Sequence, residues 1–246
     1  MAEKFYTELA KYYDKFHSYI DYKKESRFIL EIIKKYRPDA KTLLDMCCGT
    51  GEHAKFLKAY GFEITGVDLN KEMLEIARQK NSELKFFEGG MKNFASKNKF
   101  DLIICHFNSI LYNKTKKELS QTLSNFYSLL GKGGLLIFDA VGKEIGLNPQ
   151  RGKFGKDENF IFRPEWTHKE NGGKEWIETD IIFEMTIGGK AQKIKDLHIL
   201  GAFSLDEIKT SAELAGFHVD IFRPDKLPLE KANPESWKGV FVCRKG

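Results

Sequence analysis

Two carboxylates and two glycines stand close together in the first part of the chain, in an order that could hold a cofactor. Asp45 ends a short apolar run, Gly49 and Gly51 follow it, and Asp68 comes 17 residues after Gly51. Glycines permit positive φ and have no Cβ, so the backbone can approach a ligand closely. A carboxylate at the position of Asp68 can bind both hydroxyls of an adenosine ribose. The spacing therefore predicts an adenosine-containing cofactor at the edge of a parallel sheet.

Two cofactors compete for this pattern. Gly49-x-Gly51-x-x-Ala54 with Asp68 also matches the dinucleotide fingerprint of NAD enzymes. Asp45 distinguishes the two, because a carboxylate before the turn would repel a pyrophosphate but suits the ammonium group of S-adenosylmethionine. A chain that binds NAD is also expected to begin on its dinucleotide-binding strand. This chain instead has two predicted helices, within residues 1–36, before its first strand. We therefore favour S-adenosylmethionine over NAD.

The elements that must position these residues alternate between strand and helix. Such alternation predicts a parallel sheet with helices on both faces. We expect an α/β, Rossmann-like fold with a seven-stranded, mostly parallel sheet. Its expected strands are Thr42–Met46, Phe62–Val67, Leu84–Phe87, Phe100–His106, Leu135–Asp139, Phe217–Phe222 and Val240–Cys243.

The alternation is interrupted between residues 142 and 202. Three antiparallel strands are expected there, at Phe160–Thr167, Trp176–Ile187 and Ala191–Leu200, and Gly188–Gly189 fits a two-residue hairpin turn. The predicted domains are an N-terminal lid of two helices (1–36), a core (37–141 and 203–246) and an antiparallel insertion (142–202). We expect the insertion to shape the substrate pocket. A homodimer contact through an exposed side of its sheet is possible, but no residue pattern supports it. Its candidate pocket residues are Arg163, Trp166, Trp176 and His198.

Composition narrows the class of protein. The net charge is +5, but the lysines are dispersed and the densest cluster is Lys114–Lys117, so a solvated surface is favoured over a nucleic-acid site. No apolar run is long enough to cross a bilayer, and Met1–Phe16 lacks the apolar stretch of a signal peptide. The four cysteines show no metal-ligand spacing and are interpreted as free thiols. We expect a cytoplasmic enzyme that uses no metal.

From Leu9 to about Leu136 the chain resembles the class I S-adenosylmethionine-dependent methyltransferases. More narrowly, it resembles the sugar N,N-dimethyltransferases of macrolide biosynthesis. The motifs that carry the resemblance are Tyr13-Asp14, Asp21-Tyr22, Leu44-Asp45-Met46-Cys47-Cys48-Gly49-Thr50-Gly51, Val67-Asp68-Leu69, Lys71-Glu72-Met73-Leu74, Phe100-Asp101-Leu102-Ile103 and Phe107-Asn108-Ser109-Ile110.

The resemblance implies a set of cofactor-binding residues. Asp68 would bind the ribose, and His106 would lie next to the transferred methyl group. Gly90 stands where the family usually has an acid for the adenine amino group, so the backbone of Met91 would serve instead. The remaining implied contacts are the methionine moiety at Asp45, Gly49, Thr50 and Gly51, the adenine faces at Leu69 and Met73, and a lid over the methionine end at Tyr13 and Tyr22.

The methyl acceptor is the part of the predicted function that the sequence determines least. Methyl transfer is an in-line displacement in which positioning provides most of the catalysis, and a neutral amine needs no strong base. The candidate catalytic residues are His106, Tyr112 and Tyr6; the amino-sugar enzymes carry a His where this chain has Tyr112. We expect a small-molecule acceptor methylated on nitrogen. A methyltransferase acting on RNA or protein, and a non-catalytic S-adenosylmethionine-binding protein, remain open.

Overall fold

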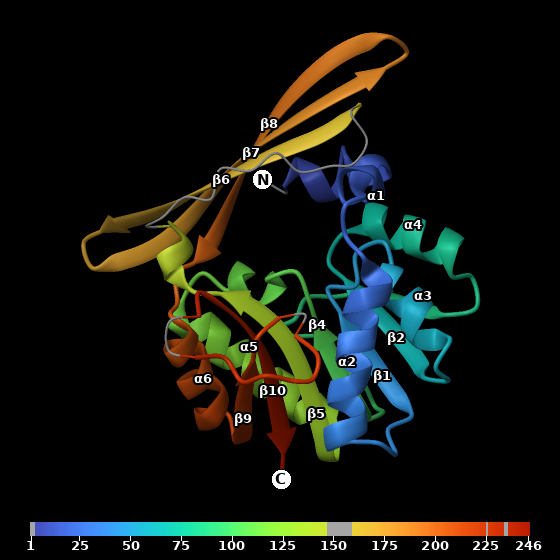
Figure 1. Ribbon diagram of the computed structural model, residues 1–246, viewed down its shortest axis with the longest axis vertical. Coiled ribbons are helices and arrows are strands. Elements are labelled where there is room, and N and C mark those ends of the chain that lie inside the picture. Colours follow the sequence, from blue (N-terminus) through green and yellow to red (C-terminus); the bar gives the residue numbers. More distant parts are fainter. Residues whose placement is uncertain (1–2, 147–158, 225, 234–235) are drawn as a thin grey trace.

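The computed structural model describes residues 3–146, 159–224, 226–233 and 236–246. Within them, seven strands form one sheet in the order β3-β2-β1-β4-β5-β10-β9, and three strands form a second sheet in the order β6-β7-β8. We call these the core sheet and the cap sheet. The cap sheet stands at one end of the molecule, beyond the helices that cover the core sheet (Figure 1).

The core sheet has its order reversal between β1 and β4. Both strands are parallel to their neighbours, whereas β10 is antiparallel to β5 and β9, so the predicted mostly parallel sheet is confirmed. Ligands of such sheets bind beyond the carboxyl ends of the strands at the reversal. The strands are β1 Thr42–Met46, β2 Glu63–Asp68, β3 Lys85–Glu88, β4 Phe100–Cys105, β5 Leu130–Val141, β9 Phe217–Phe222 and β10 Lys238–Lys245.

Helices cover both faces of the core sheet, as the alternation of elements predicts. Leu43 packs in a buried cluster with residues of α2 and α3, while the next residue, Leu44, packs with residues of α5 and α6. Successive strand residues point to opposite faces, so this pair shows that β1 is buried on both sides. The helices are α2 Tyr22–Tyr36, α3 Glu52–Lys58, α4 Lys71–Lys80, α5 Lys116–Leu129 and α6 Leu205–Leu214.

The N-terminal segment, which we define as residues 3–21, differs from the expected first helix. It contains only single turns, namely η1 Lys4–Tyr6, η2 Ala10–Tyr12 and α1 Tyr13–Phe16, and only the second expected helix, α2, is continuous. Phe5 and Phe16 are buried against the cap sheet, and Met73 of α4 belongs to the same cluster. Burying each such side chain contributes about 1.5–3 kcal/mol, which outweighs the small difference in propensity between a helix and separate turns.

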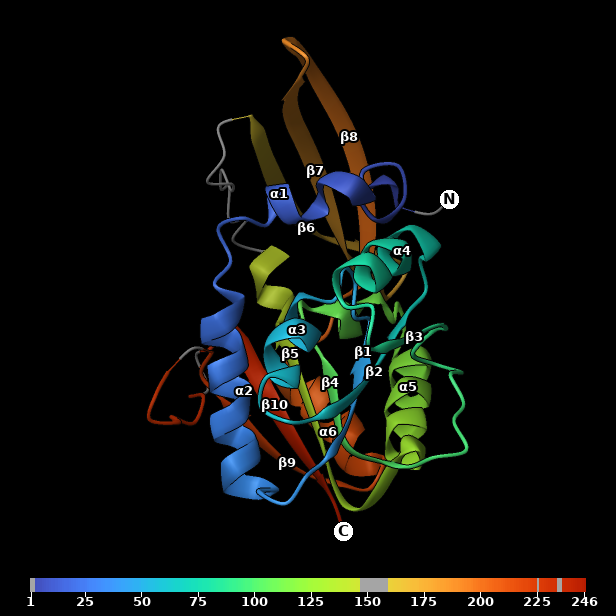
Figure 2. The ribbon, with the colours of Figure 1, turned by 90° about the vertical axis from the view of Figure 1, so that its right-hand side faces the viewer.

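The N-terminal segment lies between the cap sheet and α4 (Figure 2). The cap sheet is antiparallel throughout, with β6 Phe160–Asn171, β7 Lys174–Ile187 and β8 Lys190–Gly201. Gly188 and Gly189 both have positive φ in the hairpin between β7 and β8, which confirms the predicted glycine turn. Residues 147–158 of the predicted insertion lie outside the described residues.

The buried side of β7 divides between two clusters. Ile177 packs in the core cluster with α5 and α6, whereas Ile181, Phe183 and Met185 pack against the N-terminal segment. One face of this strand therefore joins the core to the N-terminal segment. In the part of the chain that the structure describes, no helix is both long and apolar enough to span a membrane.

Candidate active site

A cavity of about 420 Å³ lies beyond the carboxyl ends of β1, β2 and β4, a size typical of small-ligand sites. The N-terminal segment and the short helix η3 (Ser109–Tyr112) complete its wall. Of the predicted cofactor-binding and catalytic residues, Gly51 alone does not line it. The lining residues that the sequence predicts are Tyr6, Tyr13, Tyr22, Asp45, Gly49, Thr50, Asp68, Leu69, Met73, Gly90, Met91, His106 and Tyr112.

The glycine loop turns sharply between β1 and α3. Cys47, Gly49 and Gly51 have φ values of +62°, +54° and +78°, and the Cys48 amide donates to the Val67 carbonyl. A Cβ on Gly49 would lie 3.3 Å from Met73 Cε, so the loop backbone passes close to α4. A Cβ on Gly51 would lie 2.9 Å from Asn81 Nδ2. Gly51 therefore seats the loop on α4, and Gly49 faces the cavity.

Asp45 is a buried carboxylate with an unused oxygen. Its side chain is 3% exposed, and Oδ2 has no hydrogen-bond partner among the described residues. Burial raises the pKa of Asp45 to about 7, a value that already includes an opposing effect of His53 and a smaller upward effect of Asp68. A buried unpaired carboxylate is costly unless a cation meets it. The site therefore fits a ligand that brings a positive charge to this position, as the ammonium group of S-adenosylmethionine does.

Asp68 is fixed at the end of β2 by hydrogen bonds to both carboxylate oxygens. The Gly49 amide donates to Oδ2 at 2.9 Å, and the Asn70 backbone and side-chain amides donate to Oδ1 at 2.9 and 3.2 Å. Burial raises the pKa of Asp68, and these hydrogen bonds oppose that rise. The carboxylate is held rigidly at the cavity wall, where it can accept hydrogen bonds from the hydroxyls of a ribose.

The N-terminal segment is tied to the cofactor end of the cavity through Asp14. Thr50 Oγ1 donates to Asp14 Oδ1 at 2.6 Å, and Lys80 Nζ lies 2.6 Å from Asp14 Oδ2. These contacts join the segment to the glycine loop and to α4. Tyr13 and Tyr22 line the cavity beside this tie, where their ring faces can favour a sulfonium cation.

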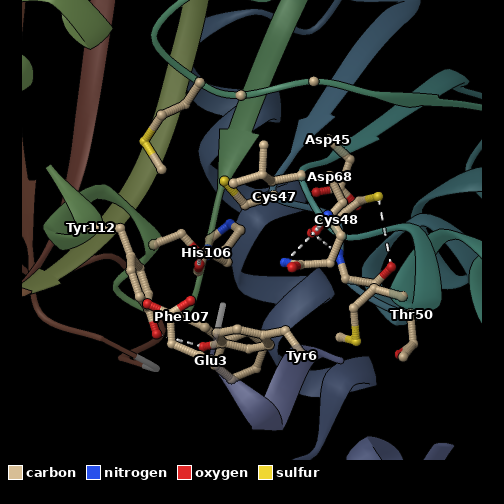
Figure 3. Close-up of a pocket in the computed structure, with 18 of the residues that line it drawn as sticks. Glu3, Tyr6, Asp45, Cys47, Cys48, Thr50, Asp68, His106, Phe107 and Tyr112 are labelled. Carbon is tan, nitrogen blue, oxygen red and sulfur yellow. Dashed lines mark hydrogen bonds between the residues drawn. The ribbon is translucent and has the colours of Figure 1, made fainter. Parts of the chain in front are cut away.

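His106 follows β4 and lies between the acidic end of the cavity and the tyrosines (Figure 3). Its Nδ1 is 3.7 Å from Asp139 Oδ1, and its buried Nε2 has no hydrogen-bond partner among the described residues. Burial would raise the pKa of Asp139, but Lys238 and His106 hold it well below its usual range. Asp139 is therefore a stable anion that orients the imidazole.

Behind His106 stands a second histidine that the sequence pattern does not single out. The His53 ring stacks on the His106 ring with centroids 5.1 Å apart, and His53 Nε2 lies 3.0 Å from Glu25 Oε2. Glu25 is in α2 and His53 in α3, so this contact depends on how the two helices pack and has no local sequence signal.

At the opposite end of the cavity the hydroxyls of Tyr6 and Tyr112 are 2.8 Å apart. Glu3 lies beside them, across the cavity from Asp45 and Asp68 (Figure 3). Tyr112 OH is 2.5 Å from His198 Nδ1, so His198 contacts the cavity through Tyr112 without lining it. The lining residues that the sequence analysis did not name as site residues are Glu3, Cys47, Cys48, Glu52, His53, Asn70, Gly89, Lys92, Phe107, Ser109, Asn113 and Lys114.

The other candidate pocket residues of the insertion do not line the cavity. The guanidinium of Arg163 bonds Glu184 on the neighbouring strand, and the Trp176 indole donates to Glu178. Trp166 packs at the edge of the core cluster. Across the described ranges, no group of three or more His, Cys, Asp or Glu side chains is placed to hold a metal ion.

Comparisons with known proteins assign the family. The profile of a family described as "Methyltransferase domain" matches residues 43–134. A "Putative methyltransferase" of Geobacillus sp. (strain WCH70) is 30% identical over 98% of this chain and 99% of its own length. The chain belongs to the S-adenosylmethionine-dependent methyltransferases.

One solved structure and one further relative are also similar to this methyltransferase. A crystal structure of an S-adenosylmethionine-dependent methyltransferase from Clostridium acetobutylicum ATCC 824 superposes with a TM-score of 0.83, at 22% identity over 98% of this chain and 99% of that one, which confirms the fold. The dTDP-3-amino-3,4,6-trideoxy-alpha-D-glucopyranose N,N-dimethyltransferase of Streptomyces venezuelae is 32% identical over 48% of this chain and 50% of its own. This amino-sugar relative therefore matches the methyltransferase over about half its length.

Proposed function

We propose that this methyltransferase transfers the methyl group of S-adenosylmethionine to an amine nitrogen of a small-molecule acceptor. The observation that carries the proposal is one cavity with two chemically different ends (Figure 3). One end has the carboxylates Asp45 and Asp68. The other has two tyrosine hydroxyls and Glu3, a carboxylate suited to attract a positively charged amine.

The cofactor fits the first end. Asp45 would bind the ammonium of the methionine moiety with its unpaired Oδ2. Asp68 would accept from the ribose hydroxyls, and Gly49 and Thr50 would border the methionine moiety. Leu69, Met73, Gly90 and Met91 would enclose the adenine, and Tyr13 and Tyr22 would cover the sulfonium.

Bound S-adenosylmethionine supplies a methyl group that its sulfonium already activates. The protein then has to hold an acceptor nitrogen in line with the sulfur–carbon bond and exclude water, which positioning alone can accomplish. Tyr6, Tyr112 and His106 surround the space left for that nitrogen. Their hydroxyl and imidazole groups can orient an amine by accepting its N–H hydrogens.

Relatives support nitrogen as the acceptor atom. Besides the amino-sugar enzyme, a glycine/sarcosine N-methyltransferase of Aphanothece halophytica is 32% identical over 130 residues. Both of these proteins are named for methylation of a nitrogen.

An amine-blocking experiment tests the acceptor class. The protein is incubated with S-adenosylmethionine labelled in its methyl group and with a bacterial small-molecule extract, either untreated or acetylated on its amines. We expect methyl uptake by the untreated extract and its loss after acetylation. Equal uptake by both extracts would contradict an amine acceptor, and uptake only by added RNA or protein would assign a macromolecular substrate. Cofactor binding without any methyl uptake would favour a non-catalytic binding protein.

A further inference from the structure

A continuous chain of hydrogen bonds leads from the cavity into the cap sheet. Tyr6 OH is 2.8 Å from Tyr112 OH, and Tyr112 OH is 2.5 Å from His198 Nδ1. His198 Nε2 is 3.0 Å from Asp196 Oδ2, which also accepts the Phe5 amide at 2.9 Å. We call these four side chains the relay: Tyr6, Tyr112, His198 and Asp196. The N-terminal segment, η3 and β8 each contribute to it.

The carboxylate at the far end sets the direction of every hydrogen bond in the relay. An ionised carboxylate only accepts, so His198 Nε2 must carry the proton that it donates to Asp196. Nδ1 of the neutral ring is then an acceptor, and the Tyr112 hydroxyl donates to it. Tyr112 oxygen in turn accepts from the Tyr6 hydroxyl. The Tyr6 oxygen, which lines the cavity, is left to accept a hydrogen bond from a ligand.

Burial isolates the His198 and Asp196 end of the relay from solvent. His198 is 2% exposed and Asp196 is 8% exposed. Burial also raises the pKa of Tyr6 and of Tyr112, so both hydroxyls keep their protons across the neutral range. Within the relay, Nδ1 of His198 is the basic nitrogen that can take up a proton passed along by the two tyrosines. The titratable groups next to the imidazole are Asp196 on its own strand, Tyr112, and Tyr6, whose ring centroid lies 5.5 Å from that of His198. Glu3 acts on the two tyrosines, since it raises the pKa of both.

We propose that the relay removes the proton from an acceptor that arrives as an ammonium ion, with His198 as a positioning residue that acts through Tyr112 and Tyr6. This rests on the proposed amine acceptor. The N–H bond of the ammonium breaks and its proton passes to Tyr6 oxygen, while the Tyr6 proton passes to Tyr112 and the Tyr112 proton to His198 Nδ1. The freed nitrogen pair then forms the N–CH₃ bond as the S–CH₃ bond breaks, and the electron pair of that bond stays on sulfur. The products are the methylated ammonium, S-adenosylhomocysteine and an imidazolium beside Asp196.

The relay also depends on the N-terminal segment. Tyr6 and the Phe5 amide reach Tyr112 and Asp196 from this segment, and the chain separations are 106 and 191 residues. The proton path is therefore complete only when the segment is packed on the cap sheet.

The first test measures the protonated nitrogen of His198 and needs no acceptor. The full chain is labelled with ¹⁵N-histidine, and the His198 resonances are assigned by their loss in His198→Gln. We expect Nε2 to carry the proton and Nδ1 to accept, with Tyr112→Phe shifting Nδ1 far more than Nε2. A proton on Nδ1 would reverse the direction of the relay and overturn the proposal. Because no acceptor is present, this result is independent of whether the acceptor is an amine.

The second test is the pH dependence of kcat, measured at saturation with the amine purified from the extract that takes up methyl in the amine-blocking experiment. Glutamine at position 198 can still accept from Tyr112 but cannot take up its proton. We expect His198→Gln to lower kcat about 100-fold near neutral pH, the usual size of a general-base effect. The deficit should shrink steadily as the pH rises towards about 10.4, where half of an aliphatic amine is neutral and needs no base.

A purely structural role would give the same loss at every pH, and that result would overturn the proposal. Comparing pH values within one variant cancels any change in the folded fraction. His218→Gln is the matched control, since His218 is an exposed histidine of β9 outside the cavity. It should leave the profile unchanged.

Discussion

Replacing Asp45 with asparagine is expected to stabilise the ligand-free protein above neutral pH while it destroys cofactor binding. Burial raises the pKa of Asp45 from 3.8 to about 7. A carboxyl whose pKa is raised on folding stabilises the fold below the unfolded-state pKa, and that stabilisation is lost as pH rises through the folded-state value. At pH 8 the ionised, unpaired carboxylate therefore destabilises the folded state by up to about 4 kcal/mol.

Asparagine removes this cost because it has nearly the same shape and no charge. We expect the free energy of unfolding at about pH 8 to rise by about 2–4 kcal/mol, with little change near pH 4. The affinity for S-adenosylhomocysteine, which carries the same ammonium group, should fall at least about 100-fold, because a buried ammonium would lose its counter-charge. Denaturant titrations at the two pH values and calorimetry measure the two effects.

Asp139→Asn is a matched control, for which we expect a change of opposite sign in the free energy of unfolding at pH 8. Asp139 is also buried, but Lys238 and His106 hold its pKa below the usual range. Its ionised form stabilises the fold above the unfolded-state pKa, and this stabilisation disappears only as pH falls through the folded-state value. The same substitution there should therefore destabilise the protein at pH 8. A loss of stability in Asp45→Asn at that pH would show that Asp45 is already paired with a cation.

Gly51→Ala is expected to destabilise the protein by about 2–4 kcal/mol, the second largest effect. The φ of +78° would cost an alanine about 1–2 kcal/mol. The new Cβ would also lie 2.9 Å from Asn81 Nδ2 and 3.4 Å from Ala77 Cβ. Asn81 is 2% exposed and donates to the Gly51 and Ala77 carbonyls, so moving it breaks two buried hydrogen bonds at about 1 kcal/mol each.

Gly61→Ala separates backbone strain from crowding. Gly61 has a φ of +92°, and nothing lies within 4 Å of its added Cβ. We expect it to cost about 1–2 kcal/mol, the strain alone. Urea unfolding of both variants gives the difference. Equal losses in the two variants would mean that α4 can move away from residue 51, and that this glycine does not seat the loop.

The sequence predicted those parts of the site that are local in the chain. The glycine loop and Asp68 follow strands whose apolar runs and turns are unambiguous, so their meeting at the sheet edge could be expected. The amide of Gly49 donates to Asp68 across that edge, as the predicted topology requires. Gly51 matched the motif but faces α4, because a letter pattern does not distinguish a glycine that meets a ligand from one that meets a neighbouring helix.

The non-local parts could not be predicted. Tyr112 bonds His198, 86 residues away, and the Phe5 amide bonds Asp196, 191 residues away. These contacts depend on how the cap sheet seats on the core, for which no short pattern exists. The separate turns of the N-terminal segment have the same origin, since its helical periodicity is overridden by packing of Phe5 and Phe16 against the cap sheet.

Calorimetric titration with S-adenosylhomocysteine tests the central claim most directly, with NADH titrated in parallel and Asp68→Ala as the comparison. We predict that the wild type binds S-adenosylhomocysteine and gives no heat with NADH. In Asp68→Ala the affinity for S-adenosylhomocysteine should fall at least about 100-fold, because the carboxylate that accepts from the ribose is missing. Heat with NADH and none with S-adenosylhomocysteine would contradict the account, and the glycine loop would then be a dinucleotide site.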